Sequence, residues 1–265
     1  MADPALFTTR RHPLALVLGL YAWALFVALA LVVVPVLLLM PSLPRRRALV
    51  RAVARAVLKL TGMRVTVHGI EHIVAPCIVV ANHESYLDGV VLQAVLPASF
   101  SFIIKREMAS VPLAGTLLRR IGAEFVERQD RHRSARDARR LMRNAAQGQS
   151  LAFFPEGTFG AEIGLRRFHI GAFAAAARAQ LPVVPIAIRG TRACLPPEHI
   201  LPRPGNIDVS VLGMIAVPPA ASTAEELERA PRMRDAARAE LLAQLQIPDL
   251  AARDSAVEVR ANQHA

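Results

Sequence analysis

The chain has 265 residues, enough for one sizeable α/β domain and an appendage, and its 32 Lys and Arg against 21 Asp and Glu give a formal net charge of +11. This charge suits an anionic surface, and because aromatic residues are only 5% of the chain and do not interleave with the arginines, lipid is preferred over nucleic acid as the partner. The two cysteines, Cys77 and Cys194, make neither a disulfide framework nor a metal set.

An uncharged apolar segment opens the chain, from Leu14 to Met40 over 27 positions. A helix of that length spans about 40 Å, more than the roughly 30 Å of bilayer hydrocarbon, so it could tilt, bend near Pro35 or form a broken hairpin. A secretory signal peptide is the competing interpretation, but the run is too long for one and basic residues follow it at once. We therefore expect a retained membrane anchor.

Positive charge is heavier after this segment than before it, so the positive-inside rule places the bulk of the chain in the cytoplasm, at the inner (plasma) membrane of a bacterium. Apolar residues separate the basic ones over 46–60, as in an amphipathic helix on lipid headgroups. Residues 1–60 are thus expected to hold the anchor and this interfacial helix. The basic residues are Arg45, Arg46, Arg47, Arg51, Arg55 and Lys59.

Short apolar runs alternate with helical patterns through the rest of the chain, which predicts an α/β sheet covered by helices on both faces. We expect one domain over 61–250 and a flexible tail over 251–265. Pro231 is expected to interrupt or kink the last helix. The predicted strands are 64–67, 77–81, 100–104, 123–126, 151–154, 183–188 and 207–217, and the predicted helices are 89–96, 111–121, 134–147, 171–179 and 223–246.

A polar turn follows the buried strand that ends at Ala81, and it carries His83 and Asp88 five positions apart. Open α/β sheets place their chemistry at such strand ends. If Asp88 folds back onto the ring of His83, its carboxylate holds one ring nitrogen as N–H and leaves the other free to accept a proton, which is the base-and-orienter half of a catalytic triad. The alternative is a turn histidine beside a helix N-cap.

Three other predicted strands also end in polar groups. Lys105 could be a solvated loop cation, Arg128 opens a basic stretch that is mostly helix surface, and Glu156-Gly157-Thr158 could be ordinary turn chemistry. If all these ends share one edge of one sheet, they supply a base, an orienter, two cations and backbone N–H groups. Such a set suits acyl transfer onto a hydroxyl that lies beside an anionic group.

Four blocks of this sequence, in order over about residues 60–215, resemble those of the glycerolipid acyltransferases of the 1-acylglycerol-3-phosphate acyltransferase (lysophosphatidate acyltransferase) type. The blocks are the NHx4D stretch from Asn82 to Asp88, Lys105-Arg106-Glu107-Met108 with Gly122 to Arg128, Phe154-Pro155-Glu156-Gly157-Thr158, and Val184 to Gly190. The resemblance implies a single mixed α/β sheet flanked by helices, behind an N-terminal membrane-anchoring helical segment, with the acyltransferase domain over 61–250.

The resemblance also implies a reaction and a set of site residues. His83 takes the proton of a lysolipid hydroxyl, Asp88 holds its tautomer, and the oxygen attacks the thioester of acyl-CoA or acyl-carrier protein. Lys105 serves the oxyanion, Arg128 the substrate phosphate, and Glu156 shapes its turn. Asn82, Gly157 and Thr158 complete the expected substrate-binding set, with no metal or redox cofactor required.

Two positions depart from the family pattern. Phe159 stands where the family often has arginine, and the stretch Phe168-His169-Ile170-Gly171-Ala172 lacks the usual lysine. Both usual cations serve the phosphate end of the acceptor, so another lysophospholipid or an amino-acid lipid is an alternative acceptor to 1-acylglycerol-3-phosphate. A non-catalytic membrane scaffold that binds lipid is a second alternative, and a lipid hydrolase in which His83 activates water is a third.

Overall fold

The computed structural model describes residues 13–127 and 131–253, except for the side chains of 131–135. Its strands form one seven-stranded mixed sheet in the order β1-β7-β6-β2-β5-β3-β4. This confirms the predicted single mixed sheet. The strands are β1 (Met63–His68), β2 (Ile78–Ala81), β3 (Ser101–Lys105), β4 (Glu124–Val126), β5 (Leu151–Phe153), β6 (Val183–Arg189) and β7 (Gly205–Val211).

Five of these strands are mutually parallel, namely β6, β2, β5, β3 and β4. β7 runs antiparallel to β6, and β1 is parallel to β7. Parallel strands bring their carboxyl ends to the same edge of the sheet, which is where α/β folds collect functional groups. The ends of β2, β3, β4 and β5 therefore share one edge, as the sequence required for a common site.

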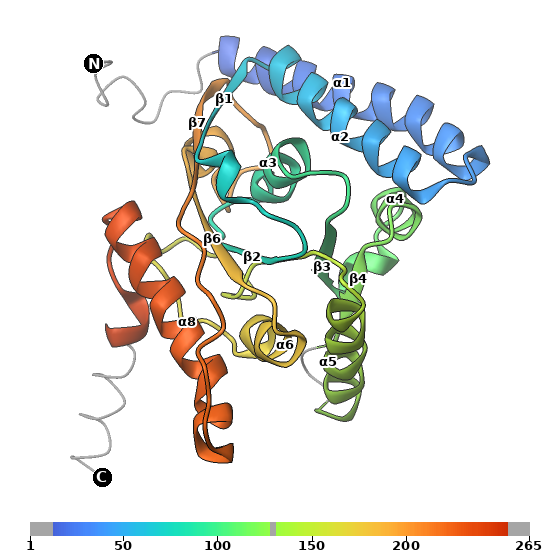
Figure 1. The fold of residues 1–265 in the computed structure, drawn as a ribbon. Helices are drawn as coiled ribbons and strands as arrows, with labels where there is room; N and C mark the ends of the chain where they lie inside the picture. Colours follow the sequence, from blue (N-terminus) through green and yellow to red (C-terminus); the bar gives the residue numbers. More distant parts are fainter. Residues whose placement is uncertain (1–12, 128–130, 254–265) are drawn as a thin grey trace.

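Helices cover both faces of the sheet (Figure 1). Within β2, Val79 and Ala81 pack on the face of α2 (Leu43–Leu60) and α3 (Leu87–Val95), whereas Ile78 and Val80 pack on the face of α6 (Gly171–Ala179) and α8 (Thr223–Leu245). All four β2 side chains are fully buried. Burial on both faces explains why this strand is an unbroken apolar run rather than an alternating one. The remaining helices are α4 (Ala114–Arg120), α5 (Arg131–Ala146) and the short α7 (Thr191–Cys194).

Some predicted boundaries were wrong. The helix expected at 111–121 is shorter and follows a separate 3₁₀ turn, Arg106–Ser110, while the strand expected at 207–217 leaves the regular ladder after Val211. Pro231 does not interrupt α8. Proline has no N–H, so it leaves the carbonyl of Leu227 without its helical donor. Leu227 is 74% exposed, so water can donate to that carbonyl instead. Residues 254–265 of the expected tail lie outside the described residues.

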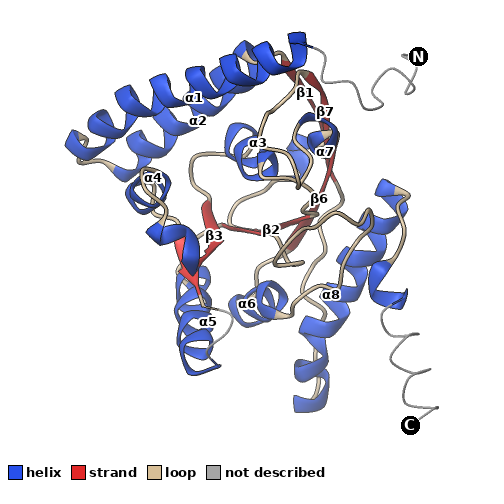
Figure 2. Ribbon diagram, turned by 180° about the vertical axis from the view of Figure 1, so that it is seen from behind, coloured by secondary structure: helices blue, strands red, loops and turns tan. Residues whose placement is uncertain are grey.

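The apolar N-terminal segment forms one continuous helix, α1 (Pro13–Leu39), rather than a broken hairpin, with Pro35 inside it. It is the one helix among the described residues that is long and apolar enough to cross a membrane. Figures 1 and 2 both show α1 lying lengthwise beside α2 across one end of the domain. Near its middle the Trp23 indole N–H donates to the carbonyl of Ile200 at 2.6 Å. At its end Arg120 of α4 donates to the carbonyls of Leu37 and Leu38, each at 2.7 Å.

Arg47 joins α2 to the sheet. Its guanidinium is buried and donates to the carbonyls of Ile121 at 2.8 Å and Ser99 at 3.1 Å, and to the hydroxyl of Ser101. The prediction that this arginine lies among lipid headgroups was therefore wrong. Loop carbonyls buried beneath α2 need a donor, and a charged one makes the stronger hydrogen bonds. Burial lowers the pKa of Arg47 below its ordinary value.

Candidate active site

Asn82 fixes the point where β2 enters the polar turn of residues 82–88. Its side-chain amide donates to the carbonyl of Ile188 at 2.9 Å and accepts from the N–H of the same residue at 2.7 Å. The side chain is only 1% exposed. These two hydrogen bonds fasten the start of the 82–88 turn to β6, the strand beside β2. The buried amide therefore faces the protein interior rather than the open edge of the sheet.

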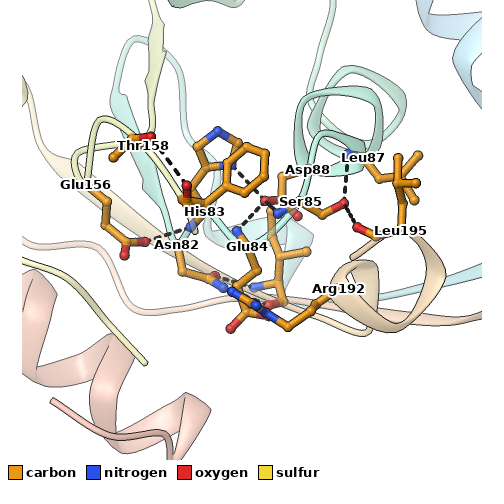
Figure 3. A network of polar contacts seen from close by, with 12 residues as sticks. Asn82, His83, Glu84, Ser85, Leu87, Asp88, Glu156, Thr158, Arg192 and Leu195 are labelled. Atoms are coloured by element: carbon orange, nitrogen blue, oxygen red, sulfur yellow. Dashed lines mark hydrogen bonds and ion pairs between the residues drawn. The ribbon is translucent and has the colours of Figure 1, made fainter. Parts of the chain in front are cut away.

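Asp88 and His83 meet as the sequence predicted. The Nδ1 atom of His83 lies 2.8 Å from Oδ2 of Asp88, which also accepts the backbone N–H of Glu84 at 2.7 Å and of Ser85 at 2.8 Å (Figure 3). Asp88 is fully buried, and the His83 side chain is 18% exposed. Asp88 sits in the first turn of α3, but it bonds back to the 82–88 turn rather than forward as an N-cap would.

This pairing sets the protonation of the imidazole. A carboxylate can only accept, so Nδ1 of the neutral ring carries the hydrogen and Nε2 keeps a free lone pair. Nε2 points away from Asp88 in Figure 3 and has no hydrogen-bond partner within the described part of the chain. His83 is thus arranged to accept a proton from a group arriving at the open edge of the sheet.

Glu156, just after β5, ties two loops together. Its Oε1 accepts the backbone N–H of His83 at 2.7 Å, and its Oε2 accepts that of Arg166 at 2.9 Å. The residue is 5% exposed, and burial raises the pKa of its carboxyl to about 7, although the two backbone hydrogen bonds act in the opposite direction. Gly157 adopts a φ of 78° and its N–H closes the turn onto the carbonyl of Phe154 at 3.0 Å, which requires the conformational freedom of glycine.

Aromatic rings enclose the His83 imidazole on two sides. Phe154 stacks on it with ring centroids 4.2 Å apart, and Phe159 meets it edge-on at 4.5 Å. Tyr86, which is 64% exposed, in turn contacts Phe159 at 4.8 Å. Phe159, where the sequence resemblance led us to expect a cation, therefore lies directly against the His83 imidazole, and with Phe154 it gives that ring apolar surroundings on two sides.

Among the other predicted site residues, Figure 3 shows Thr158 beside His83, whereas Lys105 lies farther from this cluster. By the strand register Lys105 is level with Asn82, but β5 separates their strands, a backbone separation of roughly 10 Å. Its side chain is exposed. Thr158 is exposed as well, with its hydroxyl 3.4 Å from the carbonyl of Phe159. Arg128 lies outside the described residues.

Sequence reasoning missed several supports of the site. Ser85 donates its hydroxyl to the carbonyl of Leu195 at 2.7 Å, and Arg192 donates to the carbonyls of Gly160 and Ala161 at 2.8 and 3.0 Å. These contacts hold the loop after Phe159 and the start of α3 against α7. Ser85 belongs to the NHx4D block and could have been considered, but backbone acceptors such as these leave no signal in residue identity.

The amino-acid sequence is similar to those of known acyltransferases. The acyltransferase family model matches residues 64–189. A chloroplast 1-acyl-sn-glycerol-3-phosphate acyltransferase of Arabidopsis thaliana is 33% identical over 153 residues, 56% of this chain and 42% of that protein. A lyso-ornithine lipid O-acyltransferase of Rhizobium meliloti is 36% identical over 132 residues, 50% of this chain and 44% of that protein. The chain thus spans less than half the length of these two curated relatives.

The fold has a counterpart among solved structures. The crystal structure of the 1-acyl-sn-glycerophosphate acyltransferase PlsC from Thermotoga maritima superimposes with a TM-score of 0.69 at 22% identity, covering 86% of this chain and 96% of that one. At this identity the likeness shows a shared fold.

The raised pKa of Glu156 predicts a pH dependence of stability. The folded-state pKa of about 7 exceeds the ordinary 4.5, so the stability that this group contributes is fully present below pH 4.5 and is lost as the pH rises through 7. We expect the unfolding free energy to fall between pH 5 and pH 8, with a contribution from Glu156 of up to about 3 kcal/mol. Glu156→Gln should remove that contribution, as measured by urea unfolding of the detergent-solubilised protein across this range.

The matched control is Glu162→Gln, an exposed carboxylate in the following loop. Its pH profile should run parallel to that of the parent. Parallel profiles for the parent and Glu156→Gln would instead mean that Glu156 ionises with an ordinary pKa and that its burial is incomplete in solution.

Proposed function

We propose that this chain acts as a glycerolipid acyltransferase and moves a fatty acyl group from an acyl thioester to the free hydroxyl of a lysolipid. The acyltransferase family model that matches residues 64–189 supports this proposal. The observation that carries the proposal is the buried Asp88 carboxylate fixing Nδ1 of His83 while Nε2 stays open. A scaffold has no use for such a pair. A hydrolase would need water at Nε2, and the aromatic walls of Phe154 and Phe159 favour an amphipathic acceptor there instead.

The proposed reaction uses His83 as base and then as acid. Nε2 takes the proton of the lysolipid hydroxyl as its oxygen attacks the thioester carbonyl carbon. The tetrahedral intermediate then collapses, the carbon–sulfur bond breaks, and the imidazolium returns the proton to the leaving thiolate of coenzyme A or carrier protein. Asp88 stabilises the imidazolium without itself being protonated. We assign Lys105 and nearby backbone N–H groups to the oxyanion and Arg128 to the acceptor phosphate, and the mechanism needs no metal or redox cofactor.

Glu156 and Asn82 act as positioning residues in this mechanism. Glu156 accepts the backbone N–H of His83, and Asn82 joins the end of β2 to β6. Together they fix the position of the His83 main chain and therefore of its ring. Holding a base within a fraction of an ångström of the reacting atom contributes several kcal/mol to a bimolecular step of this kind. Gly157 and Thr158 complete the loop that faces the acceptor.

The acceptor that we favour is 1-acylglycerol-3-phosphate, which would give phosphatidate for phospholipid synthesis. The name of the Arabidopsis relative supports it. A second candidate is a lysolipid without a terminal phosphate, such as an ornithine lysolipid or a lysophospholipid. Two observations favour that candidate: the Phe159 ring fills the place of a cation beside His83, and one relative is a lyso-ornithine lipid O-acyltransferase.

We further propose that α1 and α2 seat the enzyme in the cytoplasmic face of the inner membrane, with α1 lying in the plane of the bilayer. The formal net charge of +11 supports this side, because the cytoplasmic leaflet carries the anionic lipids that attract basic residues. The contacts of α1 with Ile200, through Trp23, and with Arg120, through Leu37, keep the folded domain beside its middle and its C-terminal end. A helix that crossed the bilayer would drag polar parts of that domain into hydrocarbon, which is costly.

The first functional prediction concerns the base. His83→Ala should leave a folded, membrane-bound protein and lower turnover at least about a hundredfold, the usual scale for a general base. Asp88→Asn should also be severe, since an amide can hold the wrong tautomer. Product formed from acyl-CoA and 1-acylglycerol-3-phosphate, measured by mass spectrometry, checks both. His199→Ala, an exposed histidine in the loop after α7, is the control. Turnover of His83→Ala within a few-fold of the parent would refute the assignment.

The second prediction concerns the acceptor. Phe159→Arg should lower the KM for 1-acylglycerol-3-phosphate by about 10- to 100-fold if the pocket faces a phosphate, the scale of one charge-assisted hydrogen bond. Phe159→Leu, which removes the ring without adding a charge, should not. A panel of lysolipids with one acyl-CoA gives the values. If the KM is unchanged and the parent prefers a lysolipid without a terminal phosphate, the second candidate acceptor is the correct one. Release of free fatty acid without any acceptor would instead favour a hydrolase.

The third prediction concerns the orientation of α1. Trp23 is the only tryptophan of the sequence, so Trp23→Phe removes the native tryptophan fluorescence. In that variant, Leu16→Trp, Val27→Trp and Leu38→Trp each add a single fluorophore at an exposed position of α1. An in-plane helix should give equal quenching depths at the three positions in vesicles of brominated lipids. A helix that crosses the bilayer should be deepest at 27, because 16 and 38 would lie about 33 Å apart along the membrane normal.

A further inference from the structure

We propose that a groove between α2, β1 and α3 binds an anionic phospholipid of the bilayer, at a place separate from the acceptor site. The groove has a volume of about 790 Å³ and lies where the chain passes from α2 into β1, the edge strand of the sheet (Figure 1). None of its lining residues belongs to the His83 cluster. Four of them are basic and none is acidic: Arg51, Arg55, Lys59 and Arg64.

Two of these cations are held in place by α3. Arg51 donates to the carbonyl of Val95 at 2.9 Å, and Arg55 donates to that of Ala94 at 2.8 Å. These carbonyls end α3 and lack intrahelical donors, so the arginines satisfy them and are positioned at the rim of the groove. Pre-positioned guanidinium groups suit phosphate oxygens, because little side-chain entropy remains to be lost on binding.

The other two cations are unpaired. Lys59 and Arg64 are exposed, and within the described part of the chain neither forms an ion pair or a side-chain hydrogen bond. Four like charges without a counter-charge repel one another, and a bound anion removes that repulsion. Charge complementarity therefore favours a phosphate head group at the rim.

The floor of the groove is apolar and too large for a phosphate alone. Leu58 and Met63 are buried there, Val65 is half-buried, and Val67 and Ile70 are 36% and 42% exposed at one end. Ligand sites of about 300–1,000 Å³ hold molecules with a substantial apolar body. An apolar floor beneath a basic rim fits an amphiphile, with its phosphate on the arginines and part of its acyl chains along β1.

The position of the groove favours a bilayer lipid. It lies under α2, which packs beside the exposed apolar helix α1, and the Tyr21 hydroxyl of α1 is 3.5 Å from the carbonyl of Leu60, next to Lys59. This step rests on the membrane seating proposed above. A lipid diffusing along α1 reaches the groove without leaving the membrane, and its head group would orient the sheet edge toward the bilayer surface.

The experiment titrates the full-length protein in non-ionic detergent with dioctanoyl-phosphatidylglycerol and with dioctanoyl-phosphatidylcholine, with bound copies counted by native mass spectrometry. The variant Lys59→Glu/Arg64→Glu should bind the anionic lipid at least about tenfold more weakly and the zwitterionic lipid unchanged. Val65→Phe, which fills the floor of the groove without changing its charge, should also weaken binding of the anionic lipid. Arg139→Glu/Arg143→Glu carries the same charge change on the exposed side of α5, across the sheet, and should bind like the parent.

Three results would overturn the proposal. The parent could bind the two lipids equally, the α5 variant could lose as much affinity as the groove variant, or octanoyl-CoA could displace the lipid one for one, which assigns the groove to the acyl donor. His83→Ala should keep the binding, because a loss there would put the lipid in the active site. The acyl-transfer assay is read separately, so failure of the lipid site is distinguishable from failure of the proposed reaction.

Discussion

A single buried oxygen, Oδ2 of Asp88, organises the functional edge of this protein. It accepts hydrogen bonds from the His83 ring and from two backbone N–H groups of the same turn, although the residue has no contact with solvent. A carboxylate removed from water is stable only when donors replace its hydration. The 82–88 turn supplies those donors only in its folded shape. Folding of the 82–88 turn therefore also fixes the tautomer of His83, because the same oxygen of Asp88 serves both.

Glu156 and Asn82 extend this constraint to neighbouring strands. They bond to the main chain of His83 and of Ile188, so they transmit the positions of β5 and β6 to the turn. Phe154 covers one face of the imidazole by stacking on it, and Phe159 contacts the same ring edge-on. The Nε2 atom, which has no hydrogen-bond partner within the described residues, thus lies beside two aromatic rings, a setting that agrees with the lipid acceptor proposed above.

The sequence was sufficient for the features that depend on local pattern. The apolar run of β2 and the spacing of His83 and Asp88 predicted a strand end with an oriented base, because both follow from side-chain chemistry over a few residues. The inward turn of Arg47 was not predictable, because an arginine on an amphipathic helix has the same sequence signature whether it meets a headgroup or the buried carbonyl of Ile121.

The position of Lys105 was only partly predictable. Its place at the end of a strand was correct, but the insertion of β5 between β2 and β3 comes from pairing of segments far apart in the chain. The sequence predicted that Glu156 shapes its turn but did not identify its partners, because they are backbone N–H groups, 73 and 10 residues away, whose amino-acid identities carry no trace of the contact. Sequence reasoning thus predicted the pairing of His83 with Asp88 and gave no sign of most of the backbone contacts that hold them.

The fastening of α1 and α2 has a consequence for how the enzyme meets its substrates. Hydrogen bonds of Arg47, Arg120 and Trp23 fasten the two helices to the rest of the domain. On the proposed membrane seating, this fastening couples the position of the active site to that of α1. In a membrane the height of His83 above the lipid surface is then constant. On the proposed function, a lysolipid would reach it by a two-dimensional search within the leaflet, whereas the thioester would arrive from solution in three dimensions. The rate would follow the mole fraction of lysolipid in the surface rather than its bulk concentration, so diluting that surface with inert lipid would slow the enzyme even at constant total substrate.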